Sequence, residues 1–201
     1  MEFFDKELKV RLTFIEEVLG SAPASKEVYR DYIASKAPDA PTIEDEIEAV
    51  GVDETADGKM TVFPRVDGKV GVWDYQIKGM FKDACGGLAR TKRSESASIK
   101  AYKKVIDKLI FVEERFIPYH FDGDVGICER PLRAQTAQGE RVALSSSETV
   151  PAGATIEFTI GLIDGNLEKY VREWLDYGRL GGFGQWRSSG KGRFTWEEIQ
   201  R

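Results

Sequence analysis

Cysteine and histidine are scarce in this chain of 201 residues, which has two cysteines and one histidine. Cys85 and Cys128 are too few for a disulfide framework or a structural zinc site, so we expect two buried thiols. His120 has no evident nucleophile or lysine partner in the sequence, and we interpret it as a bystander rather than a general acid or base. With so few cysteines and histidines, the chain has few side chains suited to metal binding or nucleophilic catalysis. We expect no metal and no cofactor.

Long apolar runs are also missing. No stretch approaches the roughly 20 apolar residues that a membrane span requires. The N-terminal MEFFDKELKV is acidic and lacks the apolar core of a signal peptide. Apolar residues make up 41% of the chain and charged residues 31%, which is usual for a soluble globular protein. We therefore expect a cytoplasmic protein with one sizeable core and no membrane partner.

An overall positive charge is absent too, because the formal net charge is −5. This value argues against a protein that binds nucleic acid by bulk charge alone. The distribution is uneven, however. Residues 1–57 carry 15 acids against 6 bases, residues 78–108 carry 9 bases against 3 acids, and residues 177–196 carry 4 bases and no acid. The two basic segments can therefore form a local anion site in an acidic protein.

The spacing of apolar residues predicts an α+β fold. LKVRLTFIE (8–16) and ATIEFTIGLI (154–163) alternate apolar and polar positions, which is typical of half-buried strands. LIFV, RFIPYHF and RFTWEEI are further strand candidates. Helical spacing is found at 25–38, 42–51, 78–91, 98–108 and 166–178.

Without its insertions, the order of elements is strand, helix, strand, strand, helix, strand. This is the ferredoxin-like (RRM-like) βαββαβ pattern, an antiparallel sheet with helices on one face. We expect a single domain over residues 1–201. Its insertions lie at about 20–73, acidic and helical, and at about 120–150, a basic hairpin with loops.

The segment from Gly178 to Gly192 holds six glycines and no acid. Glycine lets the backbone approach a ligand and direct consecutive N–H groups at an anion, while arginine binds phosphate through two parallel hydrogen bonds. Phe183 and Trp186, if exposed, offer faces on which bases stack. The alternative is a flexible hairpin whose Trp186 and Phe194 only pack on the sheet. The run GQWRSSGKGR lacks the GKS or GKT of a Walker motif, so ATP hydrolysis is not indicated.

A second basic motif, Lys78, Gly79 and Lys82, is expected at the start of the helix at 78–91. A helix N-terminus favours anions, and lysines there strengthen the effect. In a ferredoxin-like fold this helix start lies near the same sheet end as the loop that follows the second helix. We therefore expect both basic motifs to face one ligand; the alternative is a solvated basic face of a helix.

The run RPLRAQTAQGER places three arginines beside amide and hydroxyl side chains that suit both phosphates and base edges. We expect a protruding hairpin that inserts between nucleotides, and the alternative is a surface hairpin without a ligand. The candidate nucleic-acid and phosphate-binding residues are Lys78, Gly79, Lys82, Arg130, Arg133, Arg141, Arg179, Gly181, Gly182, Gly184, Trp186, Arg187, Lys191 and Arg193.

Four segments resemble one family. LKVRLTFIEEVLG resembles the opening strand of the RAMP superfamily, the proteins that form the RNA-binding backbone subunits and processing enzymes of CRISPR complexes. DYQIKGMFKDACGGLAR is similar to the family signature at the first helix, VPAGATIEFTI to the entry into the third core strand, and LGGFGQWRSSGKGRF to the C-terminal glycine-rich loop. The resemblance covers about half of the chain. Two features depart from it: WDYQ replaces the family's proline-glycine-serine-serine before the lysine, and the insertion after the first strand is long.

The resemblance implies a protein that binds single-stranded RNA without catalysis. The chain also resembles unassigned proteins encoded by phages and prophages of Gram-positive bacteria, which suggests a phage protein that acts on host defence. Family nucleases cut with an aspartate in the loop after the first strand. Asp39 and Asp45 lie in that region without a matching motif, so no catalytic residue is assigned.

Three alternatives stay open. One is a protein that sequesters a small nucleotide. Another is an interaction or assembly module that joins a host or phage protein complex or forms a homo-oligomer. The last is a RAMP-type endoribonuclease.

Overall fold

The computed structural model describes residues 3–23, 60–136 and 139–200. Its centre is a four-stranded antiparallel sheet with the strand order β12-β1-β11-β7. The strands are β1 (Lys6–Phe14), β7 (Ile110–Val112), β11 (Thr155–Leu162) and β12 (Phe194–Glu198).

The alternating pattern of β1 explains its place in the middle of the sheet. Leu8, Val10, Leu12 and Phe14 are all at most 1% exposed, and the residues between them lie on the other face. The same face is continued by β11, where Phe158 pairs with Val10. The two strands expected from their alternation are confirmed, because one face is buried against helices along their full length.

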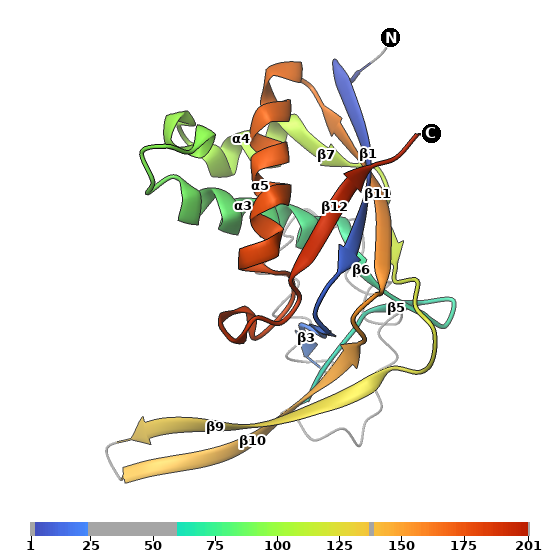
Figure 1. Cartoon of the computed structure of the whole chain (residues 1–201), viewed down its shortest axis with the longest axis vertical. Coiled ribbons are helices and arrows are strands. Elements are labelled where there is room, and N and C mark those ends of the chain that lie inside the picture. Colours follow the sequence, from blue (N-terminus) through green and yellow to red (C-terminus); the bar gives the residue numbers. More distant parts are fainter. Residues whose placement is uncertain (1–2, 24–59, 137–138, 201) are drawn as a thin grey trace.

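Three helices lie on one side of this sheet: α3 (Asp74–Leu88), α4 (Tyr102–Leu109) and α5 (Glu168–Gly181) (Figure 1). The helices α3 and α5 meet at Phe81 and Trp174, whose ring centroids are 5.6 Å apart. Both side chains are fully buried, which anchors the two helices to each other as well as to the sheet. The expected α+β class with antiparallel sheets is confirmed.

Helix α3 begins four residues earlier than the sequence predicted. The Trp73 backbone N–H donates to Gln76 Oε1 at 2.8 Å, and Gln76 Nε2 donates to Ser21 Oγ at 2.9 Å. These bonds occupy backbone and side-chain groups at the first turn and fix the helix start at Asp74. The prediction that Lys78, Gly79 and Lys82 begin this helix is therefore wrong, because all three lie in its interior.

The two insertions differ from each other. The described parts of the first, residues 20–23 and 60–73, contain short strands, while the predicted helices at 25–38 and 42–51, with Asp39 and Asp45, lie outside the described residues. Two smaller sheets result, of order β5-β6-β8 and β2-β10-β4-β3 with β9 paired to β10. Their strands are β2 (Val18–Leu19), β3 (Ala22–Pro23), β4 (Met60–Val62), β5 (Arg65–Val66), β6 (Lys69–Trp73), β8 (Phe116–Pro118), β9 (Gly126–Thr136) and β10 (Gly139–Val150).

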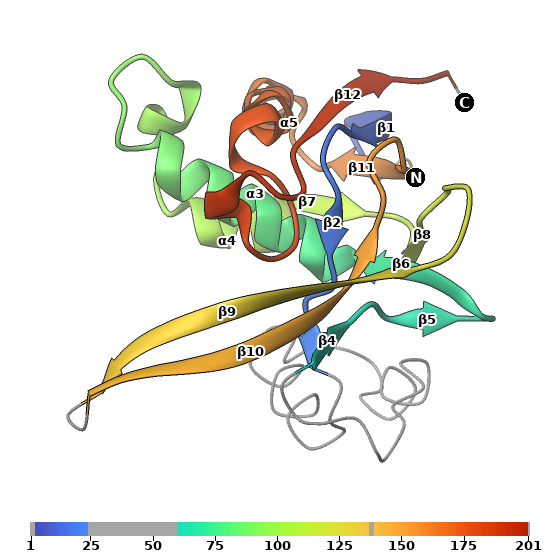
Figure 2. The same ribbon diagram turned by 60° about the horizontal axis from the view of Figure 1, so that its bottom comes forward.

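The β9–β10 hairpin projects far from the body of the molecule (Figures 1 and 2). Its root is held by Glu148 on β10. This carboxylate accepts the Phe63 backbone N–H at 2.8 Å and forms an ion pair with Arg65 at 2.5 Å. The long strands of the basic insertion are thus tied to the core at one end only.

The polar segment TKRSESAS between α3 and α4 is an ordered element. Its 3-10 helix η1 (Glu95–Ser98) docks on α5 through Glu173, which accepts the backbone N–H groups of Glu95 and Ser96 at 2.7 and 2.9 Å. Trp174 Nε1 donates to Ser96 Oγ at 2.9 Å. The basic residues around η1 are therefore presented on a fixed support. Two further 3-10 helices are η2 (Gly165–Leu167) and η3 (Arg187–Ser189).

Both cysteines are free, but only Cys85 is fully buried, and Cys128 is partly exposed. Burial raises the pKa of the Cys85 thiol. Among the described residues, no helix has both the length and the apolar composition that crossing a membrane requires.

Candidate nucleic-acid interface

A groove with a volume of about 1490 Å³ lies between α3, the first turn of α4, the end of α5 and the loop that joins α5 to β12. Figure 2 shows this loop beside α3 and over the β9–β10 hairpin. The groove is open to solvent. It brings together segments that are about a hundred residues apart in the sequence, such as Asp83 and Arg187.

The charges of the groove are predominantly positive. The cations that line it are Lys82, Arg90, Lys103 and Arg187, and Asp83 is the one acid among the described residues of its lining. Aromatic side chains are interleaved with these charges: Tyr75, Tyr102, Tyr177 and Trp186. Cations next to aromatic faces are the combination with which proteins hold the backbone and bases of single-stranded nucleic acid.

The glycines of the loop allow close packing within the protein. Gly192 has φ +68°, and a Cβ there would lie 1.8 Å from the Phe183 carbonyl oxygen. At Gly184 (φ +81°) a Cβ would lie 2.7 Å from the Leu19 carbonyl oxygen. No side chain fits at these two positions, and a left-handed backbone adds strain for any L-residue.

The backbone N–H groups of this loop are largely used inside the protein. Gly182 N–H donates to Gly178 O at 3.1 Å, Phe183 N–H to Gly192 O at 2.9 Å, and Gly192 N–H to Glu17 O at 2.8 Å. The expected cradle of consecutive N–H groups aimed at one anion is therefore not formed at these positions. Side chains of the loop, among them Trp186 and Arg187, line the groove.

Three of the cations proposed from sequence are paired with acids. Arg187 forms an ion pair with Asp83, Lys82 pairs with Asp107 at 2.5 Å, and Lys191 pairs with Glu17 at 2.5 Å. The hydrogen bond to Glu17 raises the pKa of Lys191. Lys191 does not line the groove, so its ion pair serves to fix the loop against the segment after β1.

Lys78 takes no part in the groove, although it was expected to face the same ligand as Arg187. Its Nζ donates to the Asp107 carbonyl oxygen at 3.3 Å and lies 4.7 Å from the centroid of the Phe111 ring. Burial lowers the pKa of the Lys78 ammonium group. The convergence predicted from sequence is formed by Gly79, Lys82 and Arg187, without Lys78.

The remaining candidate residues are dispersed. Gly181, Gly184 and Trp186 line the groove, whereas Gly182, Arg179 and Arg193 do not, the two arginines being exposed outside it. Arg133 on β9 and Arg141 on β10 belong to the hairpin strands, and their side chains lie outside the described part of the chain. Arg130 is buried beside Trp186, and Phe183 is buried against Phe14, with centroids 6.3 Å apart. Of the two aromatic residues proposed for stacking, only Trp186 exposes its ring.

Sequence reasoning missed Arg90 and Lys103. Both are exposed, and within the described residues neither forms an ion pair. In the sequence, basic residues outnumber acidic ones within 78–108, but this excess does not indicate which of the basic residues would line a groove. Only the folded arrangement of α3, η1 and α4 shows which of these bases line the groove.

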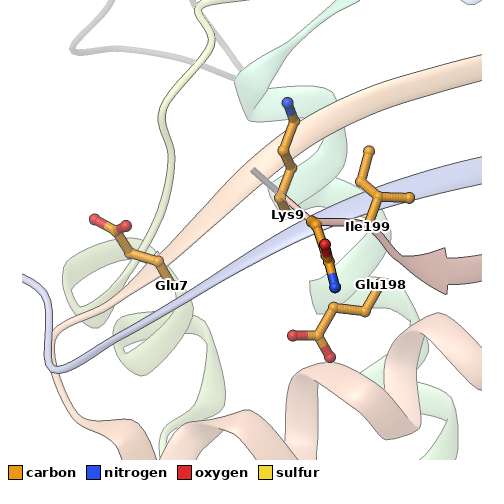
Figure 3. Close-up of a pocket in the computed structure, with 5 residues that line it drawn as sticks. Glu7, Lys9, Glu198 and Ile199 are labelled. Atoms are coloured by element: carbon orange, nitrogen blue, oxygen red, sulfur yellow. The ribbon is translucent and has the colours of Figure 1, made fainter.

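The other face of the four-stranded sheet, which none of the described helices covers, has a different character. On this open face Arg11 donates to Glu157 at 2.8 Å and to Glu197 at 2.9 Å. A smaller pocket of about 530 Å³ lies at the edge of the sheet, lined by Glu7, Lys9, Glu198, Ile199 and Gln200. Figure 3 shows that Lys9 and Glu198 point to opposite sides of their strands, so they do not converge on a ligand.

Clusters of metal-binding side chains are not found in the described part of the chain. Residues 3–23, 60–136 and 139–200 contain no group of three or more histidine, cysteine, aspartate or glutamate side chains that could hold a metal ion. His120 is exposed, and its backbone pairs with Thr155.

Comparisons with known proteins give a likeness of fold. No protein-family model matches the chain, and no curated protein matches it by sequence. Among solved structures, it is similar to a chain in the cryo-EM structure of the Type III-B Cmr-beta bound to cognate target RNA. The TM-score is 0.51 and the identity 12%, over 97% of this chain and 60% of that chain. A chain of a Type IV-B CRISPR complex is also similar, with a TM-score of 0.45 and 9% identity over 96% of this chain and 90% of that chain.

The first of these likenesses shows that the fold is shared with a chain of an RNA-bound CRISPR-type assembly. At 12% identity it shows the fold alone. This chain spans about three fifths of that neighbour's length, so the neighbour's activity and partners are not thereby properties of this protein.

Proposed function

We propose that this protein is a RAMP-like subunit that binds single-stranded RNA, without catalysis, in the groove between α3 and the glycine-rich loop. The observation that carries the proposal is the groove itself, with four cations and four exposed or partly exposed aromatic residues against one acid. Its open form favours a strand over a small nucleotide, which a closed pocket would suit better.

The fold supports the same proposal. The order of β1, helices, β7, β11, α5 and β12 corresponds to the ferredoxin-like pattern that the RAMP resemblance implies. The neighbour with this fold is a chain of an assembly bound to target RNA. An RNA partner and a place in a multi-subunit assembly follow from this likeness as part of the proposal. The phage origin and a role against host defence stay predictions from the sequence resemblance.

The β9–β10 hairpin extends the proposed RNA path. It runs beneath the glycine-rich loop and continues beyond the body of the molecule (Figure 2). Arg133 and Arg141 lie on its two strands, close to each other in register, since Val142 pairs with Arg133. An RNA strand that leaves the groove along this hairpin would meet both positions.

The test is a titration of labelled single-stranded RNA followed by fluorescence anisotropy at several salt concentrations. The variant R90A/K103A removes the two groove cations that have no ion pair among the described residues. We expect it to bind about tenfold more weakly, and its salt slope to fall by about 0.7 for each phosphate that the variant no longer neutralises.

The matched control is K9A/K69A. Lys9 lines the edge pocket of Figure 3 and Lys69 is exposed on β6, so this variant removes the same charge away from the groove. It should bind RNA as the unaltered protein does. Equal loss in both variants, or no RNA binding by the unaltered protein, would contradict the proposal.

A further inference from the structure

Trp186 has an unusual backbone conformation for its size. Its φ and ψ of 54° and 35° place it in the left-handed region, which bulky residues rarely adopt. Glycines occur on both sides of it in the loop, yet this position has a tryptophan. Strain of this kind persists when the surrounding contacts hold the residue in place, and it gathers at sites of function.

Arg130 provides such a contact from beneath. Its guanidinium carbon lies 5.0 Å from the centroid of the Trp186 ring, and its Nη2 donates to Gln185 Oε1 at 3.0 Å. The arginine is only 7% exposed, and Nε and Nη1 have no hydrogen-bond partner. No carboxylate among the described residues forms an ion pair with it.

A buried cation without a carboxylate is costly to keep, and attraction to the face of the indole offsets part of that cost. The same attraction fixes the orientation of the ring. Arg130 does not line the groove, while Trp186 does and is 38% exposed. The part of the ring that is open to the groove is therefore turned away from the arginine.

We infer that Trp186, held from behind by Arg130, is a stacking platform for one unpaired nucleobase. This inference rests on the proposed RNA-binding function and states which part of the RNA the groove selects. A preoriented indole gives a base a flat apolar face without further ordering of the side chain, so little entropy is lost on binding. The positive charge of Arg130, which forms no ion pair with an acid among the described residues, is weakly screened in the interior and attracts the phosphate beside the stacked base.

The site distinguishes unpaired from paired nucleotides. In a duplex both faces of each internal base are already stacked, so only a single strand or an extruded base can lie on Trp186. The subsite would therefore select single strands by their base faces, and the cations of the groove would hold the backbone. Arg130 acts here as a positioning residue.

The first experiment compares short single-stranded RNA with an abasic oligonucleotide of the same length, using tryptophan emission and anisotropy. RNA should quench the emission of Trp186 and bind about tenfold more tightly than the abasic strand. In W186A both the quenching and this preference should disappear, and in W186F the preference should largely return. The difference between W186A and the unaltered protein isolates the signal of Trp186 from those of the buried Trp73 and Trp174 and the partly buried Trp196.

The outcomes separate this inference from the function on which it rests. If RNA and the abasic strand bind equally and with the same salt dependence, the RNA-binding function holds and the stacking platform is overturned. If neither strand binds, the proposed function itself fails. Duplex RNA that quenches Trp186 as strongly as single-stranded RNA would also overturn the inference.

The second experiment tests Arg130 with R130M and R130K, with thermal unfolding to establish that each variant is folded. R130M keeps the volume of the side chain without its charge, and it should reduce the preference for RNA over the abasic strand to near unity. R130K keeps a cation and should restore part of that preference. If both variants keep the full preference, Arg130 does not position the ring. Should R130M not fold, R130Q, which also removes the charge, makes the same comparison with R130K.

Discussion

The groove and the open face of the sheet belong to the same small fold, but they differ in whether their cations form ion pairs. On the open face Arg11 is held by two glutamates on the neighbouring strands. In the groove Arg187 pairs with Asp83 and Lys82 with Asp107, whereas Arg90 and Lys103 have no ion pair among the described residues.

The difference shows that pairing, and not the number of basic residues, determines which surface can attract a polyanion. The hydrogen bonds that Arg11 donates to Glu157 and then to Glu197 raise the pKa of Arg11, a sign that its charge is satisfied within the sheet. Phosphate would have to displace these carboxylates before binding there. In the groove, binding at Arg90 or Lys103 breaks no ion pair between described residues.

The largest expected effect concerns the loop that builds one wall of the groove. G192A places a Cβ 1.8 Å from the Phe183 carbonyl oxygen, at a backbone φ of +68°. Since this contact is with backbone, the loop has to shift, and we expect a loss of about 3 kcal/mol or more in unfolding free energy. RNA binding should fall with it, whereas the open face should keep its arrangement. Chemical denaturation and anisotropy measure the two effects.

The control for this variant is G153A. Gly153 also has a positive φ, +89°, but a Cβ there would meet nothing within 4 Å. G153A therefore measures only the loss of unfolding free energy caused by a left-handed backbone at an alanine, about 1 kcal/mol. It should leave RNA affinity unchanged. If G192A costs no more than G153A, the packing account of the loop glycines is wrong.

The next effect is smaller and of opposite sign. D83N removes the single lining acid of the groove and releases Arg187, so RNA affinity should rise by about threefold, as expected for an exposed ion pair. The matched variant on the open face, E197Q, makes the same change in net charge at Arg11. It should leave RNA affinity unchanged. An equal increase in both variants would mean that overall charge, and not the groove, governs binding.

Much of the fold could be predicted from the sequence, because its central elements follow simple periodicities. The alternation in β1 and β11 and the helical spacing of Val171, Trp174 and Leu175 in α5 each mark a buried face. The start of α3 could not be predicted in the same way. The run VWDYQ has the aromatic and β-branched residues of a strand, and the bond from Trp73 to Gln76 that begins the helix is visible only in the structure.

The candidate site was less predictable than the fold. The glycine-rich loop was recognisable from composition, but its meeting with Gly79 and Lys82 was expected on the premise that these residues begin the helix, whereas they lie in its interior. The acids that pair with the cations could not be predicted. Asp83 and Arg187 are 104 residues apart in the sequence, and they pair because the loop packs on α3. The sequence offers no local signal for such a pair, and none that separates exposed Lys103 from partly buried Lys78.

The smallest expected effect tests that last distinction within the basic segment. K78M removes an ammonium group whose pKa is lowered by burial, so the charge is less favourable in the folded than in the unfolded chain. The charged Lys78 therefore lowers the free energy of unfolding at pH values below its pKa in the folded chain. This destabilisation is relieved as the pH rises through that pKa toward the pKa of the same group in the unfolded chain. The methionine keeps an apolar stem beside Phe111, and we expect unfolding free energy at neutral pH to change by less than about 0.5 kcal/mol. RNA affinity should also be unchanged, in contrast to R90A/K103A. A clear loss of RNA affinity in K78M would show that the bound strand reaches beyond the groove to the far side of α3.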